Sequence, residues 1–229
     1  VEAHIAELTE TAERQRLFIG GVTHEFKTPL TALLLHSRML RRANMSEDER
    51  NNSLAHIETQ CEWLERLVQT LLKLITLERE IERRPCEVDA LFDTVRQNTQ
   101  KSLADRGVTL ITHSGGGTLN CNADLIQSLL INLVDNAAKA YDTDAPDKRV
   151  FLTFSADTIE VWDFGRGIPE KAMRRIFEPF YMADKSRSKK AGGSGLGLAL
   201  VKRIADAHDA ELTVESSFEK GTTVRVHFQ

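Results

Sequence analysis

Apolar residues recur at alternating steps of three and four along residues 1–43. The positions in this repeat are Ile5, Leu8, Ala12, Gln15, Ile19, Val22, Phe26, Pro29 and Leu33. A heptad repeat of this kind predicts a long helix that packs along one seam against other helices. A second repeat with the same spacing follows at Leu54, Ile57, Cys61, Leu64, Val68, Leu71 and Ile75. We therefore expect the chain to begin with two long helices.

A polar break at 44–49 separates the two repeats. Ser46 and Glu49 within it have the spacing of a capping box, which starts a new helix. Two long helices joined by so short a loop form an antiparallel hairpin. Further leucines widen its apolar stripe, namely Leu30, Leu34, Leu35, Leu67, Leu72 and Leu74. One hairpin cannot bury this stripe, so we expect two copies to form a four-helix bundle; an apolar partner within the same chain is the alternative.

His24 lies within the first repeat. With Val22 and Phe26 on the seam, His24 takes the heptad position farthest from it, so we expect an exposed side chain. Pro29 falls inside the same helix, where it offers no N–H to the carbonyl of Glu25 and costs about 3 kcal/mol. An ordinary surface histidine would explain the position. A costly proline beside a titratable ring favours a functional role.

The composition changes after a charged run at 78–84 that ends at Pro85. Alternating patterns predict strands at 86–88, 108–112, 118–122, 150–155, 158–163, 211–216 and 222–228. Asp89 is expected to cap the first of three helices, at 89–105, 123–140 and 196–208. Helices over a mixed or antiparallel sheet make the fold class α+β. The loop at 164–194, with a short helical piece at 171–177, is long enough to indicate an active-site lid.

Charge and cysteine content narrow the partners. The formal net charge of −4 gives no overall basic field, so no nucleic-acid partner is expected. Cys61, Cys86 and Cys121 fit neither a zinc pattern nor a disulfide framework, and indicate a reducing compartment. No apolar run approaches the ~20 residues of a membrane span. Because the chain begins at Val1 in helical sequence, we expect it to be a fragment of a longer protein.

Two asparagines stand out on the apolar helix at 123–140. Asn132 and Asn136 lie on one helical face, with Lys139 nearby. Buried amides are costly without partners. The carbonyl oxygen of Asn136 could bind Mg²⁺, which prefers oxygen ligands and shares them with phosphates, and Lys139 could reach a phosphate. Helix packing alone would explain the asparagines equally well.

Two glycine-rich segments complete the candidate residues. Asp163 can accept a hydrogen bond from an exocyclic amine, and Gly165 and Gly167 after it let the backbone approach a flat base, although a tight turn would also explain them. The segment Gly192–Leu198 precedes a helix, where free N–H groups favour anions. A basic cluster upstream could screen a polyphosphate or form a solvated face: Lys185, Arg187, Lys189 and Lys190.

In this order the motifs resemble those of the sensor histidine kinases of two-component signalling, over nearly the whole chain. The similar segments are His24–Leu30 (H box), Asn132–Lys139 (N box), Asp163–Ile168 (G1 box), Phe177–Phe180 (F box), Gly193–Leu198 (G2 box) and Gly221–Thr223 (last glycine box). The resemblance implies a dimeric phosphoacceptor hairpin at 1–80, a linker at 81–86 and, at 87–229, an ATP-binding domain of the fold shared by gyrase, Hsp90 and MutL.

The resemblance also implies roles. His24 would be phosphorylated from ATP and pass the phosphoryl group to an aspartate of a response regulator, with Glu25 as the acid/base and Thr28 positioning water for a phosphatase activity. ATP and Mg²⁺ would be the cofactors, with Asn136 as the metal ligand. The nucleotide would be bound by Asn132, Asn136, Lys139, Asp163, Gly165, Gly167, Ile168, Phe180, Gly193, Gly195, Leu196, Gly197, Leu198 and Thr222.

The resemblance implies three further expectations. The protein would be a homodimer, and its parent would be anchored in a bacterial membrane with this portion cytoplasmic. Two candidate hinges for domain movement are the run Glu78–Pro85 and Pro29. Ala140 separates Lys139 from Tyr141, whereas members of the family often carry an aromatic residue directly after this lysine. Two rival functions are an ATPase of the gyrase/Hsp90 type and a non-catalytic dimeric scaffold.

Overall fold

The computed structural model describes residues 2–42, 44–77, 81–184 and 193–229, and it divides into two compact units, Val1–Leu72 and Lys73–Gln229. We call these the hairpin unit and the nucleotide unit. The charged residues 78–80 and the basic cluster at 185–190 lie outside the described residues, as does Gly192, the first residue of the expected glycine segment. The predicted domain limits at residues 80 and 86 remain a prediction.

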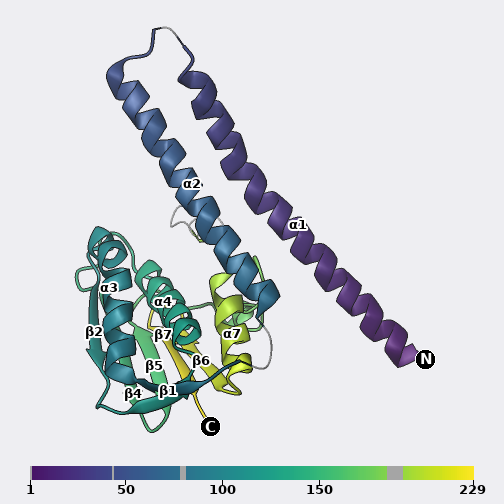
Figure 1. The fold of residues 1–229 in the computed structure, drawn as a ribbon, viewed down its shortest axis with the longest axis vertical. Helices are drawn as coiled ribbons and strands as arrows, with labels where there is room; N and C mark the ends of the chain where they lie inside the picture. The colour runs from purple at the N-terminus through teal and green to yellow at the C-terminus, as the bar shows by residue number, and fades with distance from the viewer. Residues whose placement is uncertain (1, 43, 78–80, 185–192) are drawn as a thin grey trace. The chain divides into compact units, whose positions relative to one another are not determined.

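The hairpin unit is built from α1 (Glu2–Met39) and α2 (Glu47–Thr76), which run antiparallel (Figure 1). The predicted capping box begins α2. Glu49 Oε2 accepts hydrogen bonds from the backbone N–H of Ser46 at 2.9 Å and from its hydroxyl at 3.0 Å, and Glu49 N–H donates back to Ser46 Oγ at 3.2 Å. These bonds lower the pKa of the Glu49 carboxyl. The local sequence therefore fixes where the second helix starts.

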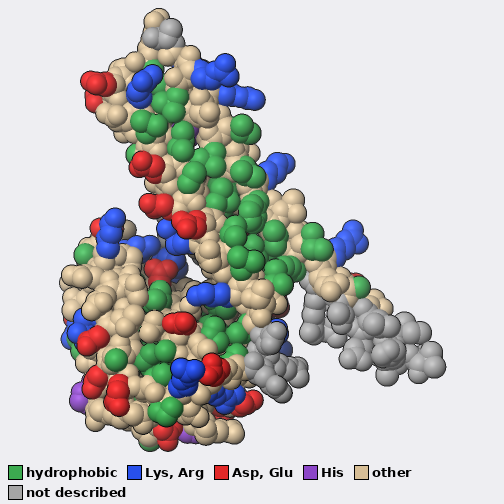
Figure 2. Space-filling model, in the orientation of Figure 1, with side chains coloured by type: hydrophobic (Ala, Val, Ile, Leu, Met, Phe, Trp, Pro, Cys, Tyr) green, Lys and Arg blue, Asp and Glu red, His purple; other side chains and the backbone are tan. Residues whose placement is uncertain are grey.

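Large apolar side chains remain exposed along both helices of the hairpin unit. They are Leu17, Ile19, Leu30, Leu34 and Leu35 on α1, and Leu54, Val68 and Leu72 on α2. Figure 2 shows hydrophobic side chains following the visible face of the two helices. The side chains of Ile5 and Leu8, at the start of the heptad repeat, lie outside the described part. Among the described residues, no helix has both the length and the apolar character of a membrane span.

The nucleotide unit contains two sheets. Its helices are α3 (Val88–Arg106), α4 (Ala123–Lys139), α5 (Glu170–Met173) and α7 (Gly197–Ala207). Its strands are β1 (Arg84–Glu87), β2 (Thr109–His113), β3 (Thr118–Cys121), β4 (Arg149–Ser155), β5 (Thr158–Asp163), β6 (Glu211–Ser217) and β7 (Gly221–His227). The main sheet has the order β2-β4-β5-β7-β6, parallel only between β2 and β4, and β1 pairs antiparallel with β3.

One face of the main sheet forms the core of the nucleotide unit. Alternate residues of the central strands are buried, including Val150 and Leu152 on β4 and Ile159 and Val161 on β5. Helices α3, α4 and α7 lie over this face (Figure 1). The predicted fold class is confirmed: the protein is α+β, with a helical hairpin followed by an α/β sandwich.

The predicted cap of α3 is wrong. The helix begins at Val88, one residue before Asp89, and its N-cap residue Glu87 makes no side-chain capping bond. Asp89 Oδ1 instead accepts a hydrogen bond from the hydroxyl of Ser114, at the end of β2. This carboxylate therefore ties α3 to the loop between β2 and β3 rather than closing its own helix.

Candidate functional site

His24 is presented on the outer face of α1. Its side chain is 65% exposed, and its Nδ1 lies 3.1 Å from Oε1 of Glu25, whose side chain is buried. Thr28 follows one turn later on the same face and is also exposed. The helix continues through Pro29, which is buried. The exposure predicted for His24 from the heptad is observed.

The contact between His24 and Glu25 distinguishes the two ring nitrogens. An ionised carboxylate can only accept a hydrogen bond, so Nδ1 carries the proton that it donates to Glu25. The lone pair of the neutral ring is then on Nε2. The buried carboxylate thus orients an exposed imidazole whose unprotonated nitrogen is available for reaction.

In the nucleotide unit, the start of α7 meets the asparagine face of α4. A Cβ added to Gly197 would lie 2.8 Å from Oδ1 of Asn132 and 3.7 Å from Nδ2 of Asn136, so a side chain there would have to displace the Asn132 amide. Asn132 donates from Nδ2 to the carbonyl of Ser128 at 2.7 Å. In the described part of the chain, Nδ2 of Asn136 is buried and has no hydrogen-bond partner. An orphaned buried amide is costly, which favours a ligand at this position.

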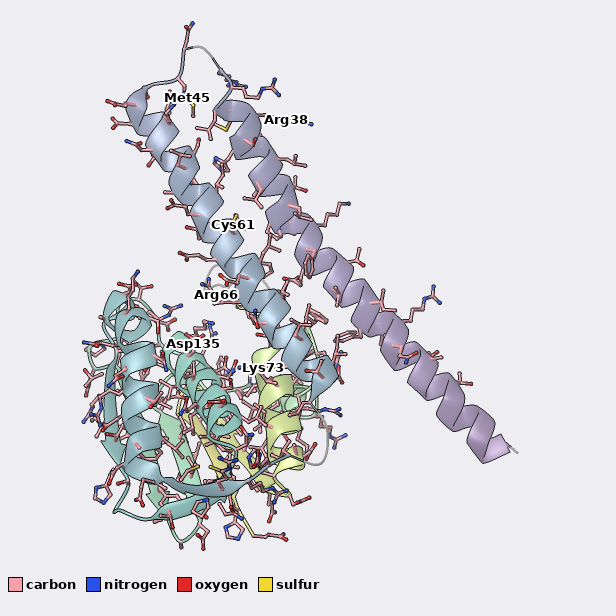
Figure 3. All side chains as sticks on the ribbon, in the orientation of Figure 1. Arg38, Met45, Cys61, Arg66, Lys73 and Asp135 are labelled. Atoms are coloured by element: carbon pink, nitrogen blue, oxygen red, sulfur yellow. The ribbon has the colours of Figure 1, made fainter. Side chains whose placement is uncertain are left out.

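Lys139 lies at the last turn of α4, beside the asparagines. Its ammonium pairs with the carboxylate of Asp135 at 2.5 Å (Asp135 is labelled in Figure 3). The Lys139 side chain is only 20% exposed. The pair holds one cation at the end of the helix where Asn136 lies.

Asp163 ends β5 with a buried carboxyl group. It accepts hydrogen bonds from the backbone N–H of Gly165, at 2.7 Å, and from that of Thr222. Burial raises the pKa of this carboxyl to about 6, although the two hydrogen bonds act in the opposite direction. The site therefore holds a carboxyl poised to change charge near neutral pH.

The loop after Asp163 is packed against main-chain atoms on both sides. A Cβ on Gly165 would lie 2.6 Å from Cβ of Ala140, and one on Gly167 would overlap the carbonyl of Ser217. Arg166 N–H donates to the carbonyl of Ala140 at 3.1 Å, and Ile168 N–H donates to Oγ of Ser216 at 2.8 Å. The glycines are required because α4 and the β6–β7 turn both approach the loop this closely.

The segments around Phe180 and Gly195 are also joined. Phe180 N–H donates to the carbonyl of Gly195 at 2.9 Å, and a Cβ on Gly195 would lie 2.8 Å from the carbonyl carbon of Phe180. Phe180 has a positive φ of 63°, an uncommon value for a non-glycine residue. Gly193 and Leu198 are half-buried, and Leu196 is fully buried. These contacts bring the two motifs to the start of α7.

Two residues of this site were not predicted from the sequence. Tyr141 is buried in the core, and its hydroxyl accepts the N–H of Phe164 at 2.9 Å and donates to the carbonyl of Arg149. Ser216 holds the other end of the loop through Ile168. The sequence signal for Tyr141 was its place just after α4, whereas nothing in the sequence marked Ser216.

The structure therefore gathers the predicted nucleotide residues within one unit. Asn132, Asn136 and Lys139 come from α4, Asp163 to Ile168 follow β5, Phe180 and Gly193 to Leu198 lead into α7, and Thr222 lies on β7. The predicted residues His24, Glu25 and Thr28 belong to the hairpin unit.

These residues fit a nucleotide with its metal. The orphaned Asn136 amide, the buried Asp163 carboxyl and the glycine backbone supply polar groups for phosphate, base and close approach. Throughout the residues that the structure describes, no three His, Cys, Asp or Glu side chains gather as a metal cluster. A magnesium ion here would consequently take most of its oxygen ligands from phosphates and water.

Two family models match the chain. Residues 14–80 match the His Kinase A (phospho-acceptor) domain, and residues 121–229 match the histidine kinase-, DNA gyrase B- and HSP90-like ATPase. The first match contains His24, and the second contains all of the nucleotide residues predicted from the sequence.

Individual proteins give the same result. Sensor histidine kinase YkoH of Bacillus subtilis is 32% identical over 224 residues, covering 96% of this chain and 49% of that protein. The structure of full-length ShkA in complex with AMPPNP is 25% identical with a TM-score of 0.63, covering 90% of this chain and 44% of that one. Histidine kinase ThkA in complex with response regulator protein TrrA shares the fold, at 19% identity and a TM-score of 0.66, over 98% and 62% of the two chains. The chain spans about half the length of the curated relatives that it matches.

Proposed function

The chain belongs to the sensor histidine kinases of two-component signalling, and from this premise we propose that it phosphorylates its own His24 from ATP and then transfers the phosphoryl group to an aspartate of a response regulator. The observation that carries the proposal is the pairing of exposed His24 with the buried carboxylate of Glu25. A carboxylate at Nδ1 leaves Nε2 as the nucleophile of a neutral ring.

Glu25 acts as the acid/base partner of His24. As Nε2 forms its bond to the γ-phosphorus, the bond from that phosphorus to the bridging oxygen breaks and ADP leaves. Positive charge then develops on the imidazole, and Glu25 stabilises it by accepting the Nδ1 proton. Because phosphoryl transfer depends mainly on positioning and charge neutralisation, a correctly held ring contributes directly to the rate.

The nucleotide unit binds ATP through the groups described above. Asp163 accepts a hydrogen bond from the adenine amine, next to the close backbone of Gly165 and Gly167. Lys139, with the N–H groups at 193–198, faces the phosphates. Mg²⁺ would neutralise phosphate charge when bound, and the carbonyl oxygen of Asn136 would hold it. The orphaned amide nitrogen of Asn136 supports a polar ligand at this residue, because it can donate to a phosphate oxygen.

The functional form is a homodimer in which two hairpins form a four-helix bundle. Support comes from the apolar side chains that the single hairpin unit leaves exposed. The partner in signalling is the receiver domain of a response regulator, as ThkA was solved with response regulator protein TrrA. We assign residues 1–80 to dimerisation and phosphoacceptance, 81–86 to a linker and 87–229 to catalysis.

A second activity acts on the phosphorylated regulator. Thr28 lies one turn from His24 on the same exposed face, so its hydroxyl is placed to hold a water that hydrolyses the phospho-aspartate.

The parent protein is anchored in the bacterial membrane by residues outside this chain, with this portion facing the cytoplasm. Support for this anchoring comes from the curated relatives, which are sensor proteins about twice as long as the part that this chain matches.

Labelling with γ-labelled ATP tests the proposal. We expect label on the protein in an acid-labile, base-stable form, which His24→Gln abolishes while ATP binding persists. His113→Gln, at an exposed histidine on β2, should leave labelling unchanged. Free phosphate without labelled protein would favour the gyrase-type ATPase, and neither product would favour the scaffold.

A further inference from the structure

The backbone loop that follows Asp163 is held at both ends by hydroxyl groups. We call residues 164–168 the Asp163 loop. Its first N–H donates to the hydroxyl oxygen of Tyr141 at 2.9 Å, and its last N–H donates to Oγ of Ser216 at 2.8 Å. Tyr141 follows α4, whereas Ser216 lies on β6. Side chains from two separate elements therefore clamp the loop.

Tyr141 is a fixed anchor for the start of the loop. Its ring is buried in the core of the nucleotide unit, and its hydroxyl donates to the carbonyl of Arg149, at the start of β4. Burial raises the pKa of this hydroxyl, so it keeps the proton that it donates. The side chain of Phe164 is 58% exposed, so core packing does little to anchor this residue. The bond to Tyr141 therefore fixes the residue directly after Asp163.

Ser216 ties the end of the loop to the strand that also binds Asp163. Its hydroxyl donates to the carbonyl of Gly221 and lies against the hydroxyl of Thr222, each at 2.9 Å. Because its single proton goes to Gly221, its lone pairs accept the N–H of Ile168 and the hydroxyl proton of Thr222. The backbone N–H of Thr222 in turn donates to the Asp163 carboxyl. One serine thus joins the loop to the carboxylate through a single residue of β7.

The middle of the Asp163 loop is bonded to the protein as well. Gly165 N–H donates to Oδ1 of Asp163 at 2.7 Å, and Arg166 N–H donates to the carbonyl of Ala140 at 3.1 Å. Four of the five loop N–H groups therefore have protein acceptors. A loop fixed in this way does not have to be ordered by the nucleotide, and its carboxylate cannot shift to suit a different base.

We propose that Tyr141 and Ser216 are positioning residues that give the nucleotide unit a preference for adenine over guanine, because they hold the Asp163 carboxylate in line with the exocyclic amine. The inference rests on the proposed binding of ATP. Adenine presents an amine donor where guanine presents a carbonyl acceptor. A fixed carboxylate rejects this carbonyl, since two acceptors then face each other without a proton. A loosened loop lets the carboxylate turn away, so the penalty against guanine falls.

Nucleotide binding tests the two hydroxyls without turnover. Displacement of fluorescent trinitrophenyl-ATP by ATP and by GTP gives both dissociation constants, above pH 7, where Asp163 is ionised since its pKa is about 6. We expect Tyr141→Phe and Ser216→Ala each to weaken ATP binding about five- to tenfold and GTP binding less than about twofold. Ser216→Thr, which restores a hydroxyl, should recover most of the preference for ATP. An unchanged ratio of the two constants, whether both affinities fall or neither does, would overturn the proposal.

Matched controls remove an exposed hydroxyl beside each anchor. Thr143→Val alters the loop after Tyr141, and Ser217→Ala alters the residue after Ser216 on β6. Both side chains are exposed, so both variants should bind ATP and GTP as the wild type does. Equal effects of the control and anchor variants would contradict the assignment.

Hydrogen exchange tests the clamp in the nucleotide-free chain. The N–H groups of Phe164 and Ile168 should be protected in the wild type. Tyr141→Phe should speed exchange at Phe164 alone, and Ser216→Ala should speed it at Ile168 alone. Fast exchange of both groups in the wild type would show that the loop is not held, and would refute the inference.

Failure of the proposed function gives a different result. ATP binding with the expected selectivity but no label on His24 would refute the proposed phosphorylation and leave the inference standing. A wild-type chain that binds ATP no better than GTP would refute the inference, even with His24 labelled.

Discussion

Within the described residues, the hairpin unit exposes eight large apolar side chains and the longer nucleotide unit exposes four. The nucleotide unit closes its core within one chain, because three helices cover the face of the sheet that its alternating apolar residues form. The hairpin unit has only two helices, and a two-helix layer has no second layer to receive its wide stripe.

The two units therefore obtain stability from different sources. The nucleotide unit has a complete core, and a buried carboxyl and an orphaned amide in its site lower its stability. The hairpin unit places its reactive groups outward and leaves large apolar side chains exposed.

The double variant Leu30→Glu/Leu34→Glu should separate the proposed homodimer. These side chains are 47% and 60% exposed in the single chain. Losing their burial in both copies costs about 6 kcal/mol or more, which raises the dissociation constant by at least roughly 10⁴. Sedimentation equilibrium measures this change. Ile111→Glu, at an exposed position of the nucleotide unit, is the control, and equal effects of the two would remove the contrast.

Asn136→Asp should nearly abolish autophosphorylation while the hairpin unit still dimerises. An added carboxylate beside the phosphates opposes their charge and removes the amide, a loss of several kcal/mol in transition-state stabilisation, or about a thousandfold in kcat. Initial rates over a magnesium titration measure it. Asn120→Asp, at an exposed position of β3, should behave as wild type. A variant with normal rates would exclude Asn136 as the metal ligand.

Asp163 should make the stability of the nucleotide unit depend on pH. Its pKa rises from 3.8 to about 6 on folding, so the unfolded chain ionises first as pH increases. Well below pH 3.8 the carboxyl is protonated in both states and does not lower the free energy of unfolding. As pH rises through 6, the free energy of unfolding falls by up to about 3 kcal/mol in total.

Urea unfolding of Asp163→Asn across pH 4 to 7 measures this dependence. The variant should lack the decline, so its free energy of unfolding should gain on that of the wild type as pH rises. Asp157→Asn, in the exposed β4–β5 turn, should follow the wild type. Parallel curves for wild type and Asp163→Asn would show that the carboxyl is not perturbed.

Thr28→Ala should give the smallest effect, confined to the hairpin unit. We expect about a tenfold loss of phosphatase activity toward the phosphorylated regulator, because one water loses its positioning group. Autophosphorylation should stay the same, since the proposed proton transfer uses only the groups of His24 and Glu25. Thr31→Ala, which removes only a bond to the carbonyl of Lys27, is the control. Loss of both activities would point to damage in the helix.

The sequence predicted those features whose partners are close in the chain. The capping box at Ser46 and Glu49 spans three residues, and the β4–β5 turn at 156–157 carries two positive φ angles between alternating strands. Periodicity alone placed His24 outward, since a heptad fixes the face of every residue on a helix.

Features with distant partners could not be predicted. Asp89 has the sequence of a helix cap, yet its hydrogen-bond donor is Ser114, on another loop. Arg83 belongs to a charged run typical of linkers, but it binds Ala207 and Asp209, more than a hundred residues away. Such pairs depend on strand register and helix placement, which composition does not encode.

The backbone loop after Asp163 has a consequence for inhibitors directed at the nucleotide unit. At Gly167 and Gly221 any side chain would overlap main-chain atoms, and at Gly165 it would meet Ala140 at 2.6 Å. A molecule that presses against this loop would therefore meet peptide groups, which no single amino-acid substitution can remove. Few single substitutions in this loop could therefore give resistance. Selectivity between related kinases would have to come from contacts with the side chains of α4.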